Sequence, residues 1–122
     1  MGIKAVFDTN ILIDYLAGYR EAKEELALYE QPQISIITKM EILVGADSSN
    51  NDLLLSFLDY FQIVALIEPI ASVAIDLRRK YKIKLPDAII WATARHSNAL
   101  LITRNTKDFS VKSSDIKVPY HL

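Results

Sequence analysis

The chain has 122 residues, of which 51% are hydrophobic and 24% are charged, and its formal net charge is −1. This composition is typical of one globular domain, here expected to span residues 1–122, and it excludes a disordered chain. The sequence contains no cysteine, which excludes a disulfide scaffold, a thiolate zinc site and a cysteine nucleophile.

Short apolar segments alternate with amphipathic ones along the whole chain. In chain order, the pattern predicts a strand at residues 3–7, helices at 10–16 and 20–30, a strand at 34–37, helices at 38–44 and 50–61, a strand at 63–66, helices at 69–81 and 86–97, and strands at 99–103 and 116–118. Strands that alternate with helices indicate an α/β fold with a central parallel sheet flanked by helices on both faces. The order of the strands in the sheet cannot be read from this pattern.

Four acidic residues stand beside the ends of these elements. Asp8 ends the first strand, and Asp108 follows the fourth. Glu41 lies in the first turn of the helix after the second strand, and Asp87 lies in the first turn of the sixth helix. Right-handed crossovers place the carboxyl ends of parallel strands at one edge of a sheet, where ligands bind in open α/β folds. We therefore expect these four side chains to gather at that edge.

Each of these acids also has a purely structural interpretation. Asp8 could cap the helix that follows it, and Asp87 could interact with the dipole of its own helix. Thr38 and Glu41 match a capping box, and Asp108 could be an ordinary turn residue.

A cluster of carboxylates, however, is costly without a cation. Two carboxylates about 4 Å apart repel each other by roughly 4 kcal/mol at an effective dielectric constant of about 20. Ligand sets made only of oxygen select hard ions, so a cluster of the four acids predicts Mg²⁺ or Mn²⁺. Such ions keep several waters and suit phosphate substrates, which points to hydrolysis of a phosphodiester.

The residues around the four acids resemble the motifs of PIN-domain nucleases, and most closely those of the VapC-type toxins of toxin–antitoxin pairs. The matching segments occur in the family order and are Val6–Leu12, Met40–Glu41, Leu85–Ala88 and Thr103–Phe109.

The resemblance implies an endoribonuclease that depends on Mg²⁺ or Mn²⁺ and acts on structured or single-stranded RNA. Its catalytic and metal-binding acids would be Asp8, Glu41, Asp87 and Asp108. In this family the last acid often contacts the metal indirectly. Asn10 and Thr103 match polar family positions that support the acids.

Basic residues beside the acids are candidates for contacts with RNA phosphates. Lys82 and Lys84 precede Asp87, and Arg104 and Lys107 flank the loop that carries Asp108.

The resemblance also implies two protein partners, a cognate antitoxin that docks in an apolar groove and a second copy of the chain in a homodimer. The helix predicted at residues 50–61 carries more leucine and aromatic residues than one buried stripe requires. It could serve either contact or be buried within the monomer. We expect a cytoplasmic protein without membrane contact, because no apolar run is long enough to cross a membrane and the first residues do not resemble a signal peptide.

Three alternatives were compared with this interpretation. A haloacid-dehalogenase-like phosphatase needs a second aspartate two residues after Asp8, where Asn10 stands. A non-catalytic phosphorelay receiver needs an aspartate after the third strand, and Leu66–Pro69 contains none. A PIN nuclease that serves RNA processing without a toxin role remains open. A gene for a small DNA-binding antitoxin directly upstream would distinguish the toxin from this last alternative.

Overall fold

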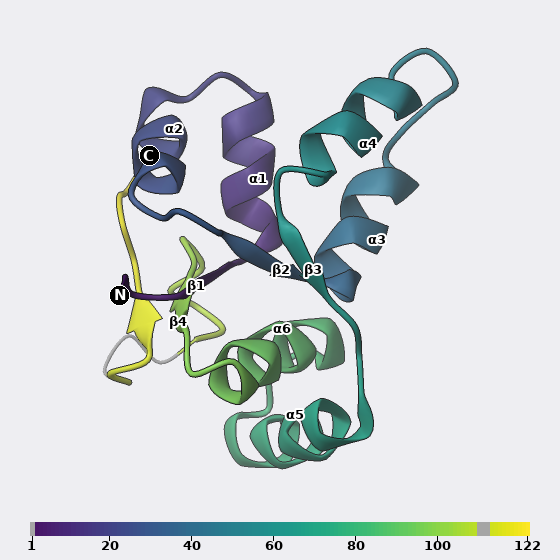
Figure 1. The fold of residues 1–122 in the computed structure, drawn as a ribbon. Helices are drawn as coiled ribbons and strands as arrows, with labels where there is room; N and C mark the ends of the chain where they lie inside the picture. Colours follow the sequence, from purple (N-terminus) through teal and green to yellow (C-terminus); the bar gives the residue numbers. More distant parts are fainter. Residues whose placement is uncertain (1, 110–112) are drawn as a thin grey trace.

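The computed structural model describes residues 2–109 and 113–122. Within them, parallel strands form one five-stranded sheet with helices on both faces (Figure 1). The strands are β1 (Ala5–Phe7), β2 (Gln33–Ser35), β3 (Gln62–Val64), β4 (Leu100–Ile102) and β5 (Ile116–Lys117). The helices are α1 (Thr9–Leu16), α2 (Arg20–Ala27), α3 (Ile36–Val44), α4 (Asn51–Leu58), α5 (Glu68–Tyr81) and α6 (Leu85–His96). The predicted α/β fold is confirmed.

The strand order β3-β2-β1-β4-β5 puts β1 at the centre of the sheet. From β1 the chain builds outward through β2 and β3, and it then returns to add β4 and β5 on the other side of β1. In open α/β sheets, ligands bind outside the carboxyl ends of the strands at such a switch in direction. Phe7, the last residue of β1, pairs with Ile102, the last residue of β4, so the two strands end side by side at the switch point.

Each face of the sheet has its own hydrophobic core. Side chains alternate between the faces along a strand. Val6 therefore packs with residues of α5 and α6, whereas Ala5 and Phe7 pack with residues of α1, α2 and α4. Figure 1 shows the α5–α6 pair on one side of the sheet and α1 to α4 on the other. The most enclosed helix is α6, in which every residue from Ala88 to Ala94 is buried.

The start of α3 differs from the sequence prediction. The helix begins at Ile36 rather than at Thr38, because the hydroxyl of Ser35 accepts a hydrogen bond of 3.1 Å from the Ile37 N–H and so caps the helix. Thr38 is therefore inside the helix and Glu41 lies in its second turn, so the capping-box interpretation of these two residues is wrong. The other predicted elements agree with the structure to within three residues at each end. None of the described helices combines the length and the apolar character that a membrane span requires.

Two isoleucines with different burial test this packing. Ile90 in α6 is 0% exposed and Ile75 in α5 is 47% exposed. We expect Ile90→Ala to lower the free energy of unfolding by about 2–5 kcal/mol, because it leaves a cavity in the core. Ile75→Ala should lower it by less than about 1 kcal/mol. Urea unfolding of the two variants measures the difference, and equal losses would contradict the described burial of α6.

Candidate acidic site at the switch point

Asp8 lies directly after β1 and is only 4% exposed. The Thr9 N–H donates to its Oδ1 at 2.7 Å, which makes Asp8 the N-cap of α1. The hydroxyl of Thr103, the residue after β4, donates to Oδ2 at 2.7 Å, and the Asn10 side-chain amide donates to the same oxygen at 3.2 Å. The capping interpretation of Asp8 is thus correct. The cap uses only Oδ1, and Oδ2 accepts hydrogen bonds from side chains of two separate segments.

Glu41 reaches the same region from α3. Its Oε1 accepts a hydrogen bond of 2.7 Å from the hydroxyl of Thr9, whose oxygen also lies 3.0 Å from the hydroxyl oxygen of Thr38. A hydroxyl has one hydrogen, so Thr9 donates to Glu41 and accepts from Thr38. Sequence reasoning missed both threonines. Thr38 could have been predicted, because it lies three residues before Glu41 and therefore on the same face of the helix.

Asp87 and Asp108 complete the group of predicted acids. Asp87 is half-buried in the first turn of α6. Asp108 lies in the loop after β4, where its Oδ2 accepts a hydrogen bond of 2.8 Å from the Asn105 side-chain amide. The Asn105 Oδ1 in turn accepts the Asp108 N–H at 3.2 Å. Asn105 was not predicted as a site residue, and it sets the orientation of Asp108.

The four carboxyl groups influence one another electrostatically. The pKa of Asp8 is raised to about 6, chiefly by burial and also by the charges of Asp87 and Glu41, against hydrogen bonds from Thr103 and Thr9 that lower it. Burial also raises the pKa of Asp87, and the charges of Asp108 and Glu41 act in the same direction. The structure therefore brings the four predicted acids into one region of negative charge.

The acids do not converge on a single point. Among residues 2–109 and 113–122, no three side chains of aspartate, glutamate or histidine are close enough to form a ready metal-binding group. Mg²⁺ typically takes one or two protein carboxylates and keeps several waters, so it does not require such a group. The donors available here are carboxylate, hydroxyl and amide oxygens, which suit a hard divalent cation.

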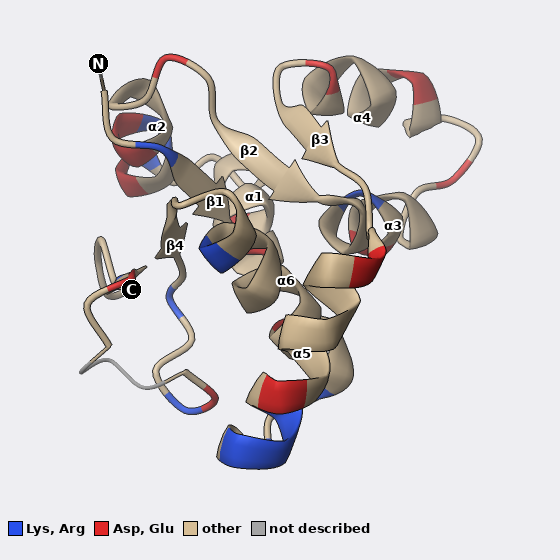
Figure 2. Cartoon of the chain, turned by 60° about the horizontal axis from the view of Figure 1, so that its bottom comes forward, with Lys and Arg blue, Asp and Glu red and all other residues tan. Residues whose placement is uncertain are grey.

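Three of the predicted basic residues lie in the segments that lead into α6 or follow β4. Lys84 immediately precedes α6, and its charge opposes the upward shift in the pKa of Asp87. Lys82 has the left-handed φ of 57° at the end of α5, and Lys107 is exposed in the loop after β4. Figure 2 shows basic residues at the C-terminal end of α5, where Arg78, Arg79 and Lys80 form the last turn before the chain enters α6.

Arg104 is engaged differently. Its Nε and one terminal nitrogen donate to the two carboxylate oxygens of Asp14 at 2.7 and 2.9 Å. This pairing directs the guanidinium at α1, so the geometry does not support the RNA contact predicted for Arg104.

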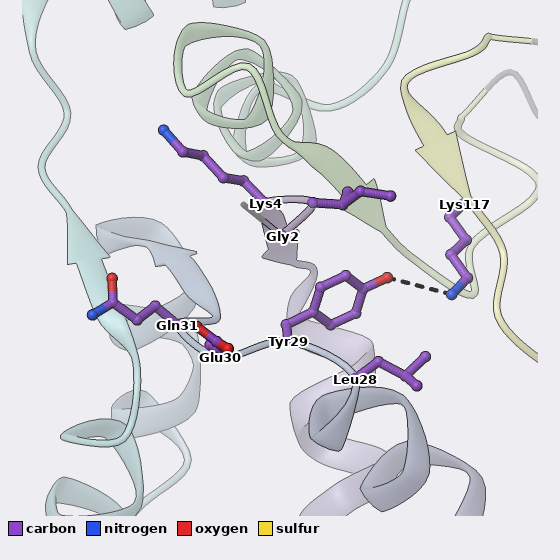
Figure 3. Close-up of a pocket in the computed structure, with 8 residues that line it drawn as sticks. Gly2, Lys4, Leu28, Tyr29, Glu30, Gln31 and Lys117 are labelled. Carbon is purple, nitrogen blue, oxygen red and sulfur yellow. Dashed lines mark hydrogen bonds between the residues drawn. The ribbon is translucent and has the colours of Figure 1, made fainter.

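A separate cavity lies where β1 and β2 begin, at the opposite edge of the sheet from Asp8 (Figure 3). It is lined in part by Lys4, Gln31 and Tyr29, whose hydroxyl accepts a hydrogen bond of 3.3 Å from the Lys117 ammonium group. None of the four acids lines this cavity.

Comparison with known families identifies the domain. The family model of the PIN domain matches residues 5–113. The chain belongs to the PIN domain family. The family resemblance recognised in the sequence is thereby confirmed, although no curated protein matches the sequence.

Solved structures similar to this PIN domain include a chain of a toxin–antitoxin complex. A chain of a toxin–antitoxin complex from Klebsiella pneumoniae is 45% identical, with a TM-score of 0.89 over 98% of this chain and 100% of the other. A chain of FitAcB from Neisseria gonorrhoeae is 25% identical, with a TM-score of 0.81 over 97% and 99% of the two chains. A chain of VapBC2 from Rickettsia felis, bound to promoter DNA, is 22% identical and shares the fold with a TM-score of 0.78 over 93% and 96%.

The raised pKa of Asp8 predicts how the stability of this PIN domain depends on pH without metal. The pKa is about 6 in the folded protein against an ordinary 3.8, so the folded state holds the proton more tightly. The stabilisation is complete below the ordinary pKa and is lost as the pH rises through about 6. A shift of this size corresponds to roughly 2–3 kcal/mol. We expect the free energy of unfolding, relative to that of Asp8→Asn, to fall by about this amount between pH 4 and pH 7.

The measurement is urea unfolding in EDTA across this pH range. Asp76→Asn, which neutralises an exposed acid of α5, is the matched control and should follow the parental profile. Parallel pH profiles for the parent and Asp8→Asn would contradict the raised pKa.

Proposed function

We propose that this PIN domain is a metal-dependent endoribonuclease and the toxin of a VapBC-type toxin–antitoxin pair. The observation that carries the proposal is the buried Asp8 at the sheet's switch point, in the electrostatic field of Asp87 and Glu41. PIN domains are generally nucleases. The toxin role is supported by the 45% identity to a chain of a toxin–antitoxin complex over nearly the whole of both chains.

Asp8 and Asp87, helped by Glu41 and Asp108, would hold Mg²⁺ or Mn²⁺. The raised pKa values of Asp8 and Asp87 support this assignment. Burial is the main cause of both shifts and the charges of neighbouring carboxylates add to it, so a bound divalent cation would stabilise the ionised form of each acid. A divalent cation bound there would supply a more acidic water and offset the negative charge of the phosphate under attack.

The other residues of the site orient the acids and bind the substrate. Thr103 and Asn10 hold Oδ2 of Asp8. Thr9 holds one oxygen of Glu41, and within residues 2–109 and 113–122 the other oxygen accepts no hydrogen bond. Lys82, Lys84 and Lys107 are proposed to contact RNA phosphates, which would counter the negative charge of the acids during binding.

The proposed protein partners are a cognate antitoxin and a second copy of the chain. A groove between α1, α2 and α4 supports a docking role, since it is lined by apolar and aromatic residues that include Leu26, Phe57 and Tyr60. Other large apolar side chains are exposed on α3 and α4, among them Val44 and Leu53 at 85% and 73%. The proposal includes a cytoplasmic location, where the RNA substrate would be met.

The first test is RNA cleavage by purified protein freed of any partner. We expect cleavage with Mg²⁺ or Mn²⁺ and none in EDTA. Asp8→Asn and Glu41→Gln should each lower the rate by about 100-fold or more. Glutamine keeps an acceptor for the Thr9 hydroxyl, so its effect isolates the charge. Asp76→Asn and Glu24→Gln, which neutralise exposed acids outside the site, should cleave like the parent. Cleavage that persists in EDTA would refute the proposed mechanism.

The second test concerns the toxin role. Expression of the chain alone should arrest growth, and Asp87→Asn should relieve the arrest while the protein stays folded. The readouts are colony counts and the circular dichroism spectrum of the purified variant. RNA cleavage without growth arrest would instead indicate a nuclease of RNA processing.

A further inference from the structure

Asp14 of α1 is a buried acid that lies outside the acidic site. Its side chain is 5% exposed, and it accepts hydrogen bonds from two distant segments. Arg104, from the loop after β4, donates to both carboxylate oxygens at 2.7 and 2.9 Å. The hydroxyl of Tyr120, from the segment after β5, donates to Oδ2 at 2.8 Å. One carboxylate therefore joins α1 to two segments that follow it by 90 and 106 residues.

The geometry of this contact is specific to arginine. The planar guanidinium matches a carboxylate with two parallel hydrogen bonds, which also fixes the orientation of the arginine side chain. A lysine could keep the charge at this place but not the two-point contact. Since a buried carboxylate without a partner is strongly destabilising, Asp14 and Arg104 depend on each other.

The backbone of Arg104 connects this contact to the acidic site. The Arg104 N–H donates to Oδ1 of Asn10 at 3.2 Å, and the amide of that asparagine donates to Asp8. The next N–H, of Asn105, donates to the hydroxyl of Thr103 at 3.0 Å, and that hydroxyl donates to Asp8. Asn105 also holds Asp108. The side chain of Arg104 is thus anchored at the point where the chain leaves β4. At the same point, the N–H groups of Arg104 and Asn105 bind the side chains of Asn10 and Thr103, which both donate to Asp8.

We propose that Arg104 and Asp14 are positioning residues of the acidic site, with Tyr120 as the third member of the contact. Through this contact, α1 holds the loop after β4 so that Thr103 can donate to Asp8 and Asn105 can hold Asp108. The inference rests on the proposed nuclease function. It also assigns Arg104 a role other than binding RNA, which leaves the phosphate contacts to the exposed lysines.

Arg104→Lys separates positioning from RNA binding. Lysine preserves a positive charge for a phosphate but loses the two-point contact with Asp14. For positioning we expect kcat to fall by about 10- to 100-fold, because small displacements of reacting groups have effects of this size. The KM and the affinity for RNA in EDTA should stay within about twofold of the parental values. Parental kcat in Arg104→Lys would overturn the proposal, as would a tenfold weaker affinity for RNA in Arg104→Gln.

Asp14→Asn tests the partner of the contact. If both residues act through one interaction, the kcat of Asp14→Asn should fall about as far as that of Arg104→Gln. The kcat of the double variant should then lie within about threefold of the kcat of the less active single variant. If Arg104 instead bound RNA, Asp14→Asn would release it and RNA would bind more tightly. Tighter binding, or losses that multiply in the double variant, would overturn the proposal.

Hydrogen exchange of the loop gives a readout that does not need activity. We expect the amides of residues 104, 105, 107 and 108 to exchange faster in Arg104→Lys, Asp14→Asn and the milder Tyr120→Phe. Glu25→Gln is the matched control, because Glu25 is a similarly buried acid, 8% exposed, that pairs with Lys117. It should leave the exchange rates of these amides unchanged.

Unchanged exchange rates in the three variants would overturn the inference. If the parental protein cuts no RNA, the proposed function is refuted. The hydrogen-exchange rates of the loop would still test whether Arg104 and Asp14 hold it in place.

Discussion

Parallel pairing of β1 with β4 is the constraint on which the candidate site depends. The two strands end in register at Phe7 and Ile102. The side chains of the next residues therefore meet, and the Thr103 hydroxyl donates to Oδ2 of Asp8 at 2.7 Å. The same arrangement starts α1 at Asp8 and encloses its carboxylate, which raises its pKa. The strand pair therefore sets the burial of this acid and its contact with Thr103, to which α6 and α3 add the charges of Asp87 and Glu41.

The position of the acids could be predicted from the sequence because it depends on local patterns. A short apolar run followed by helix-starting residues marks the end of a strand, and this placed Asp8 correctly. The helix after the second strand was placed less well. The β-branched Ile36 and Ile37 favour a strand locally, and the cap provided by Ser35 overrides that preference.

The contacts between distant segments could not be predicted. The hydrophobic periodicity of the sequence does not determine the order of the strands. The pairing of β1 with β4, and the contact between Asp8 and Thr103 that depends on it, could therefore not be predicted. The bond between Arg104 and Asp14 spans 90 residues and depends on the same pairing. A basic residue beside an acidic motif indicated RNA binding, whereas the fold turns this side chain to α1.

The distance along the chain between Asp8 and Thr103 has a consequence during synthesis. The two residues are 95 positions apart, and β4, which Thr103 directly follows, enters the sheet only after the ribosome has made it. At about 5–20 residues per second, translation takes roughly 5 to 20 seconds to cover that interval. A growing polypeptide cannot have an assembled acidic pocket in this time. If the chain cuts RNA as proposed, a growing chain becomes a competent nuclease only after Thr103 has left the ribosome and β4 has paired with β1.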